Sequence, residues 1–228
     1  MYDTTAVMTV EQQAGRPTQA GRRARTRAAL LEAAARGLSR YGYANLVLER
    51  VASEAGYTRG ALYHLFAGKQ ELVLAAVEWV DDTWQAEVGP LAAAAGDPVA
   101  ALIAIARGHA LYCRRDIARV MMTLRVEFSG QDHPVGAAVE KVIRRLTSAC
   151  AALIQAGRAS GAIPAGPPPR LLAGAYLSAV EGLVIGMAGH PPFDVELAER
   201  VARGILGLPP QQQPQPQPRP SSVDDVIH

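Results

Sequence analysis

A short segment near the N-terminus combines residue types that can bind phosphate groups and base edges. Thr58 offers a hydroxyl at the expected start of a helix, where free backbone N–H groups also attract anions. Arg59 carries a forked cation suited to guanine or phosphate, and Gly60 lets the backbone approach the floor of a groove. Lys69, expected at the start of the next helix, adds a second phosphate-binding cation. The predicted nucleic-acid contacts are Thr58, Arg59, Gly60, Ala61, Tyr63, His64 and Lys69.

Three helices are needed to position these side chains, and the sequence predicts all three. Apolar residues recur every three or four positions over 25–41, which indicates an amphipathic helix that ends at Gly42. A second helix is expected over about 46–55, with Asn45 as its N-cap. The third, over 59–66, follows a turn that contains glycine. Two short helices separated by such a turn are typical of a helix-turn-helix motif.

The run YGYANLVLERVASEAGYTRGALYHLFAGKQEL (41–72) resembles the N-terminal domain of TetR/AcrR-family transcriptional regulators. The matching residues are Gly42, Val51, Ala52, Ala55, Gly56, Thr58, Gly60, Leu62, Tyr63, Phe66, Lys69 and Leu72. The resemblance implies an all-helical homodimer that binds a palindromic DNA operator and releases it when a small molecule binds. It assigns the DNA contacts to the seven residues given above. Leu48 and Leu65 depart from the family pattern, because polar or ring-bearing side chains usually stand there.

The distribution of charge supports a separate DNA-binding module. Residues 16–69 contain ten Arg or Lys and three Glu, a net of +7, whereas 70–228 contain 13 basic and 16 acidic residues, a net of −3. Five arginines fall within 16–27, which predicts an arm that enters the minor groove or follows the phosphate backbone. The alternative for this arm is a solubilising tail.

The rest of the chain shows a helical pattern without a competing strand signal, so the predicted fold class is all-α. A fourth helix is expected from Lys69 to about Gly89-Pro90, and further helices over 98–113, 116–128, 135–158, 170–188 and 194–206. The predicted domains are a flexible basic arm (1–23), a helix-turn-helix domain (24–84, recognition motif 47–66), a helical effector-binding and dimerisation domain (85–208) and a disordered Pro/Gln-rich tail (209–228).

The larger domain lacks the motifs of the common catalytic and phosphate-binding sites, so no enzyme activity, cofactor or metal is predicted. His109 and Cys113 have the helical spacing of two metal ligands, but two ligands alone make a weak site. A soft apolar pocket is predicted instead. Its candidate effector-binding residues are Trp84, Val88, His109, Tyr112, Cys113, Met121, Leu124 and Phe128. Glu127 and Glu181 could orient a polar effector, although exposure or an ion pair is expected for Glu127.

A stripe of small residues in the helix expected over 170–188 predicts close packing against another helix. It consists of Gly174, Ser178, Gly182 and Gly186, which we assign to a homodimer interface. Packing within one subunit is the alternative.

The absence of a signal peptide or disulfide framework predicts a cytoplasmic protein without a membrane partner. Together with the resemblance to TetR/AcrR-family regulators, these features predict a ligand-responsive repressor with three partners: a double-stranded DNA operator, a small-molecule effector and a second copy of the chain. Two alternatives remain at this stage. The chain could be a helical ligand-binding protein or enzyme with an incidental basic face, or a constitutive architectural DNA binder that responds to no small molecule.

Overall fold

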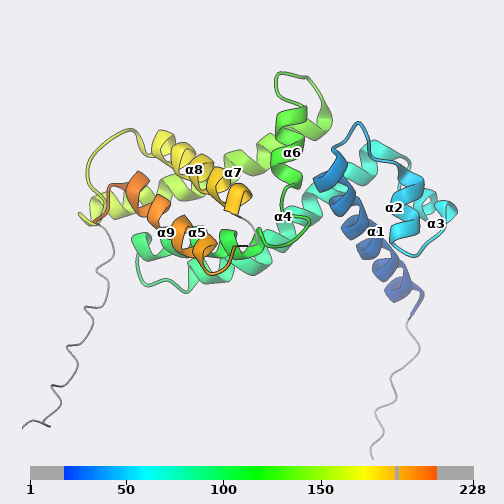
Figure 1. Ribbon diagram of the computed structural model, residues 1–228, viewed down its shortest axis with the longest axis horizontal. Coiled ribbons are helices and arrows are strands. Elements are labelled where there is room, and N and C mark those ends of the chain that lie inside the picture. Colours follow the sequence, from blue (N-terminus) through cyan, green and yellow to red (C-terminus); the bar gives the residue numbers. More distant parts are fainter. Residues whose placement is uncertain (1–17, 188–189, 210–228) are drawn as a thin grey trace, which may run out of the picture. The chain divides into compact units, whose positions relative to one another are not determined.

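The structure is a computed structural model that describes residues 18–187 and 190–209, and all regular structure within these ranges is helical (Figure 1). This confirms the predicted all-α class. The helices are α1 (Gln19–Tyr41), α2 (Leu48–Glu54), α3 (Arg59–Leu65), α4 (Lys69–Ala93), α5 (Pro98–Tyr112), α6 (Val120–Glu127), α7 (Pro134–Ala159), α8 (Pro169–Met187) and α9 (Phe193–Leu206).

The described residues form two compact units. Unit 1 contains the residues up to Gln85 together with Arg115–Ile143, and unit 2 contains Ala86–Arg114 and the residues from Arg144 onward. Helices α4 and α7 run through both units. Because α6 packs on α1, a segment distant in sequence joins the unit that holds the helix-turn-helix. The predicted functional boundary at 84/85 stays a prediction, since these units are defined by packing.

Helix α1 supplies the core of unit 1 with one apolar face. Leu30, Leu31 and Leu38 are essentially inaccessible to solvent, and their spacing puts them on the side of α1 that meets α2 and α6. The helix ends where predicted. Gly42 has φ of +73°, a left-handed value that glycine adopts without steric cost.

The N-terminal arm differs from its prediction. The structure begins α1 at Gln19, because the Thr18 side chain accepts a hydrogen bond of 3.1 Å from the backbone N–H of Gly21 and so caps the helix. Residues 19–27 are therefore helical, and the four arginines among them lie on α1 rather than in a flexible segment. The remainder of the predicted arm (1–17) and nearly all of the predicted tail (210–228) lie outside the described residues.

Two helix ends also differ from the sequence prediction. Asn45 does not cap α2, because its side-chain N–H donates back to the Tyr41 carbonyl over 3.2 Å, and α2 begins at Leu48. Helix α4 does not end near Pro90 but continues through it to Ala93.

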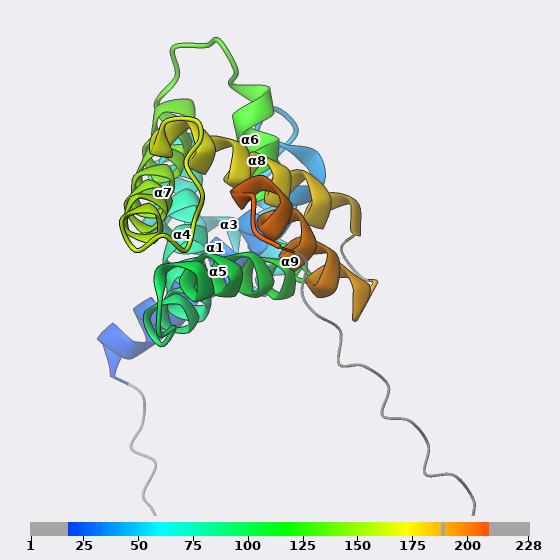
Figure 2. The same ribbon diagram turned by 90° about the vertical axis from the view of Figure 1, so that its left-hand side faces the viewer.

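In unit 2, α9 packs against both α5 and α8 (Figure 2). The fully buried Tyr176 of α8 donates its hydroxyl hydrogen to the Leu102 carbonyl of α5 over 2.6 Å. At the start of α9, the buried carboxylate of Asp194 accepts two hydrogen bonds from Arg114, at 2.8 and 2.9 Å. Burial of apolar side chains together with these paired polar groups holds the three helices in place.

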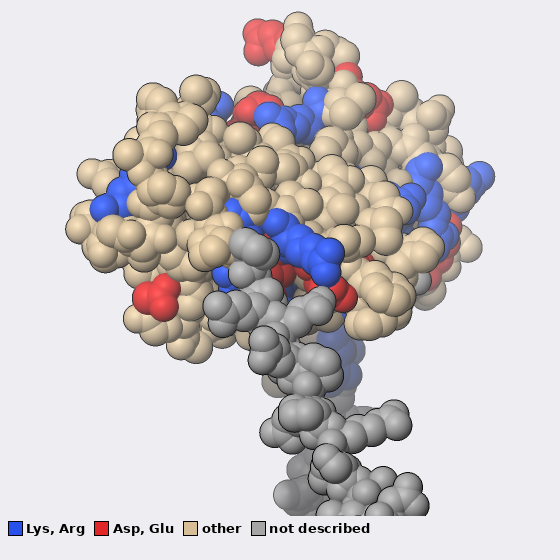
Figure 3. Space-filling view, turned by 60° about the vertical axis from the view of Figure 1, so that its left-hand side comes forward, with Lys and Arg blue, Asp and Glu red and all other residues tan. Residues whose placement is uncertain are grey.

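The surface of unit 2 carries exposed apolar side chains. Leu171 and Phe193 are 68% and 60% exposed, and Leu91 and Leu111 are close to half exposed. Uncharged residues make up most of the face shown in Figure 3. Among the described helices, α8 alone is long and apolar enough to cross a membrane by length and composition, a test that core helices of soluble proteins also pass.

Candidate nucleic-acid interface and effector site

Helix α3 exposes most of its predicted contact residues and buries its anchor. The Thr58 hydroxyl oxygen accepts a hydrogen bond of 3.2 Å from the Ala61 backbone N–H, which confirms Thr58 as the N-cap. Leu62 is fully buried and fixes the helix to the core of unit 1. Thr58, Arg59, Gly60, Tyr63 and His64 are exposed, whereas Ala61 is half-buried.

Arg59 is held in place by two neighbours. Its Nε lies 3.1 Å from the Glu49 carboxylate of α2, and its guanidinium lies 5.2 Å from the centre of the Tyr63 ring. Both partners of the ion pair are more than half exposed, so the pair contributes at most about 1 kcal/mol. A phosphate or guanine could therefore replace Glu49 as the partner of Arg59 at little cost.

Lys69 faces the loop between α1 and α2. Its ammonium donates a hydrogen bond of 3.0 Å to the Ala44 carbonyl and lies 4.8 Å from the centre of the Tyr43 ring. The structure thus places Lys69 beside this loop and half-buried. Its phosphate contact stays a prediction, as do the other six.

Glu127 of α6 binds the same loop, which the sequence did not indicate. Its carboxylate accepts hydrogen bonds from the backbone N–H groups of Tyr43 and Ala44, at 2.6 and 2.7 Å. A Cβ at Gly42 would lie 2.7 Å from a Glu127 oxygen, so only glycine leaves room for this contact. The expected ion pair or free exposure of Glu127 was wrong. Glu127 and Lys69 together fix the loop that leads into α2.

We expect Glu127→Gln to loosen the loop between α1 and α2. The amide places a donor where the carboxylate accepts, and the charge-assisted bonds to Tyr43 and Ala44 are lost, so unit 1 loses about 1–2 kcal/mol of stability. Hydrogen exchange at these two amides should accelerate. Glu140→Gln removes the same charge from an exposed pair with Arg125 and is the control. Unchanged exchange in Glu127→Gln would contradict the role assigned to this carboxylate.

The predicted effector residues divide between the two units. Val88, His109, Tyr112 and Cys113 belong to unit 2, and Trp84, Met121, Leu124 and Phe128 belong to unit 1. In unit 1, Leu124 is fully buried, and Phe128 stacks on His133 at 4.2 Å and meets the Tyr43 ring edge-on at 5.2 Å. Phe128 is thus part of the core of unit 1. The assignment of these eight residues to an effector site stays a prediction.

In unit 2, His109 contacts both Glu181 and Cys113. The Nε2 of His109 lies 2.6 Å from the Glu181 carboxylate and 3.5 Å from the Cys113 sulfur. Burial alone would lower the pKa of His109, but its hydrogen bonds to Cys113 and Glu181 outweigh burial and raise the pKa to about 10. His109 is therefore an imidazolium at neutral pH, ion-paired with Glu181. Within the described part of the chain, no group of three or more metal-ligating side chains gathers.

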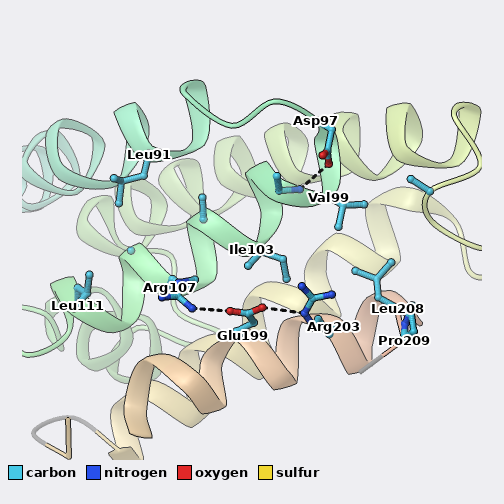
Figure 4. A pocket seen from close by; sticks show the side chains of 14 residues that line it. Leu91, Asp97, Val99, Ile103, Arg107, Leu111, Glu199, Arg203, Leu208 and Pro209 are labelled. Carbon is cyan, nitrogen blue, oxygen red and sulfur yellow. Dashed lines mark hydrogen bonds and ion pairs between the residues drawn. The ribbon is translucent and has the colours of Figure 1, made fainter. Parts of the chain in front are cut away.

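A different set of residues lines an open groove in unit 2. The groove has a volume of about 900 Å³ and lies between α5 and α9 (Figure 4). None of the predicted effector residues lines it, although Gly108 and Leu111 are their neighbours in α5. Sequence reasoning missed it because it depends on which helix packs beside α5.

The predicted dimer residues lie on an open face of α8. A Cβ at Gly174, Gly182 or Gly186 would meet no atom within 4 Å, and Ser178 is exposed. Within the described residues, no helix of the same chain packs tightly against this stripe. The alternative of packing within one subunit therefore loses its support, whereas the interface between subunits stays a prediction.

Comparison with known proteins agrees with the geometry of α2 and α3. Residues 30–76 match the family model for bacterial regulatory proteins of the tetR family. No curated protein matches the chain.

Several solved structures share its fold. SCO4454, a TetR-family transcriptional regulator from Streptomyces coelicolor, is 22% identical with a TM-score of 0.67, over 81% of this chain and 95% of that one. The fatty acid degradation regulator FadR from Bacillus halodurans is 16% identical with a TM-score of 0.67, over 80% and 95%. AibR, solved with isovaleryl coenzyme A and operator DNA, is 20% identical with a TM-score of 0.60, over 80% and 96%.

The capped helix α3, its buried anchor and the all-helical fold give the chain the architecture of a helix-turn-helix protein. Residues 30–76 form a TetR-family DNA-binding domain, in a chain with the fold of TetR-family transcriptional regulators.

Proposed function

We propose that the chain is a cytoplasmic, ligand-responsive repressor that binds a palindromic operator as a homodimer and leaves it when a small apolar effector binds. The observation that carries the proposal is α3. It is capped by Thr58, anchored by Leu62, and exposes Arg59, Tyr63 and His64 within a TetR-family domain. The AibR complex with an acyl-coenzyme A and operator DNA supports the expectation that this fold can couple the two kinds of ligand.

The homodimer follows from the symmetry of a palindromic site, since two copies of α3 must enter successive major grooves. The open small-residue stripe on α8 supports the interface. Effector binding would then alter the tilt of α4, whose first residue, Lys69, contacts the α1–α2 loop. A change in the separation of the two reading helices releases the operator.

The proposal is tested by fluorescence anisotropy with labelled DNA from the promoter region of the chain's own gene. We expect sequence-selective binding whose affinity falls steeply as salt rises, because phosphate contacts release counterions. Equal affinity for promoter and random DNA would overturn the proposal.

Arg59→Ala should weaken binding to the selected operator by about 1–3 kcal/mol and reduce the preference over random DNA. The reason is the loss of a forked donor aimed at a base edge. Arg144→Ala removes the same charge from an exposed position of α7 outside the helix-turn-helix, and is the matched control. If both variants lose the same affinity on operator and random DNA alike, Arg59 reads no base.

A further inference from the structure

The groove between α5 and α9 has the dimensions of a small-molecule site. Its volume of about 900 Å³ falls within the range of known ligand pockets. The end of α4, the segment after α7 and the short segment after α9 complete its walls, so it lies wholly within unit 2. In Figure 4, Leu91 and Leu111 lie at one end, and Leu208 and Pro209 at the other.

The lining is mainly apolar, and part of it is exposed to water. Leu91 and Leu111 are 46% and 48% exposed. Covering such apolar surface with a ligand contributes about 25 cal/mol of binding free energy for each Å² removed from water. Val99 and Ile103 of α5 continue the apolar lining toward the Leu208 end of the groove. An apolar body laid along this wall would cover these side chains.

A short row of charges crosses the groove from α5 to α9. Glu199 of α9 is 5% exposed and accepts from Arg107 over 2.7 Å and from Arg203 over 2.9 Å. Burial would raise the pKa of Glu199, but the hydrogen bonds from the two arginines outweigh it and lower the pKa. Glu199 is thus ionised, and the row as a whole carries one excess positive charge.

Both arginines have N–H donors that Glu199 does not use. Each guanidinium uses one nitrogen for Glu199, and their other nitrogens make no hydrogen bond within the described part of the chain. Asp97, the other acid of the groove, is on the far side from this row in Figure 4, and its carboxylate caps α5 by accepting from the Ala100 N–H over 2.8 Å. The positive charge is therefore not cancelled by Asp97.

We propose that this groove binds an amphiphilic carboxylate, a small molecule with an apolar body and one anionic head. The head accepts hydrogen bonds from the unused donors of Arg107 and Arg203 and balances the excess charge, because a guanidinium fork matches a carboxylate. The body lies along Leu91, Ile103 and Leu111. The inference goes beyond the proposed function, since it concerns unit 2 alone and requires no response of DNA binding.

The test is isothermal titration calorimetry of the full chain, without DNA, using decanoate and decylammonium as probes. The two share an apolar chain and carry opposite charges. We expect decanoate to bind at least about tenfold more tightly, which corresponds to about 1.4 kcal/mol. Equal affinity for the two probes, or no heat from decanoate, would overturn the proposal.

Two matched pairs of variants locate the site. Arg107→Gln should weaken decanoate about tenfold, whereas Arg200→Gln, on an exposed arginine of α9 outside the groove, should not. Leu111→Asp should abolish binding, whereas Val126→Asp, at an exposed position in unit 1, should leave it intact. Both leucine and valine are exposed enough for the folded state to tolerate the change.

Two results would show that decanoate does not bind in this groove. Binding that survives both Arg107→Gln and Leu111→Asp would show that decanoate occupies a different site. If Leu111→Asp instead converts a dimer into a monomer, a second copy covers the groove, and the proposal is wrong. Because the titration contains no DNA, failure of the chain to bind an operator would leave these outcomes unchanged.

Discussion

Gly182→Arg should leave the chain folded but shift it from dimer to monomer and abolish tight operator binding. The substitution adds a long cation in the middle of the small-residue stripe of α8. If α8 of a second copy packs there, the guanidinium must lose water without gaining an acceptor, and it faces its symmetry mate. Like charges brought together in this way cost several kcal/mol, so the dimer should weaken by about 100-fold or more.

The design separates association from folding. Position 182 is helical, and a Cβ there meets no atom within 4 Å, so the monomer tolerates the substitution. Replacing glycine within a helix even favours the helix, by up to about 1 kcal/mol. Sedimentation velocity gives the oligomeric state, and urea unfolding at low protein concentration gives the stability of the monomer.

Gly96→Arg supplies the matched control, because Gly96 is exposed between α4 and α5 with nothing within 4 Å of an added Cβ. It adds the same charge away from α8. A Gly182→Arg chain that sediments like the unmodified protein would remove α8 from the interface. Loss of dimer in both variants would indicate a general effect of charge.

Capping residues and glycines in the sequence predicted the start of α3 and the end of α1 correctly. Thr58 caps α3 through its own side chain, and Gly42 ends α1 by its backbone conformation, so both features depend only on neighbouring residues. Asn45 shows the limit of such signals. Its side chain donates to the Tyr41 carbonyl instead of capping α2, which begins at Leu48.

Packing overrode a local signal at Pro90. Proline removes a backbone donor and normally ends or kinks a helix. In α4 the neighbouring Val88 and Leu91 pack against Gly108 of α5, which has no side chain to hold α4 away. These contacts favour helix on both sides of Pro90, and α4 continues to Ala93.

The hydrogen bonds from the α1–α2 loop to Glu127, and the row of charges in the groove, join residues that are far apart in the sequence. Glu127 is more than 80 residues from Tyr43, and Arg107 is 92 residues from Glu199. No spacing rule links such positions, and an isolated acid in a helix normally indicates an exposed side chain. The sequence therefore indicated which residues could read DNA, but not which side chains hold the loop beside them.

Arg114→Met should destabilise unit 2 by about 3 kcal/mol, because it leaves the Asp194 carboxylate without its bidentate partner. Asp194 is 1% exposed, and Arg114 is about one-third exposed, which places the loss at the low end for breaking a buried pair. The double variant Arg114→Met/Asp194→Leu should recover most of the loss, since no charge then remains buried. Urea unfolding followed by circular dichroism measures each variant at pH 7.

The loss of stability in Arg114→Met should depend on pH in a definite direction. Hydrogen bonds from Arg114 lower the pKa of Asp194 in the folded chain, so the pair stabilises the fold above the unfolded pKa of about 3.9 and is lost as pH falls through the folded value. Without Arg114, only backbone N–H groups such as that of Val195 offset the cost of burial, so protonation relieves more of the buried charge. The deficit of Arg114→Met should therefore shrink from pH 7 toward pH 4.

Arg200→Met breaks an exposed pair with Glu196 on the same helix and should cost less than about 0.5 kcal/mol at either pH. An Arg114→Met deficit as small as this, or one that grows in acid, would mean that water or another group already compensates Asp194. The start of α9 would then be held by apolar packing alone, and the pair could be replaced without loss. The predicted result instead makes Arg114 the residue that permits a buried carboxylate where α9 meets α5.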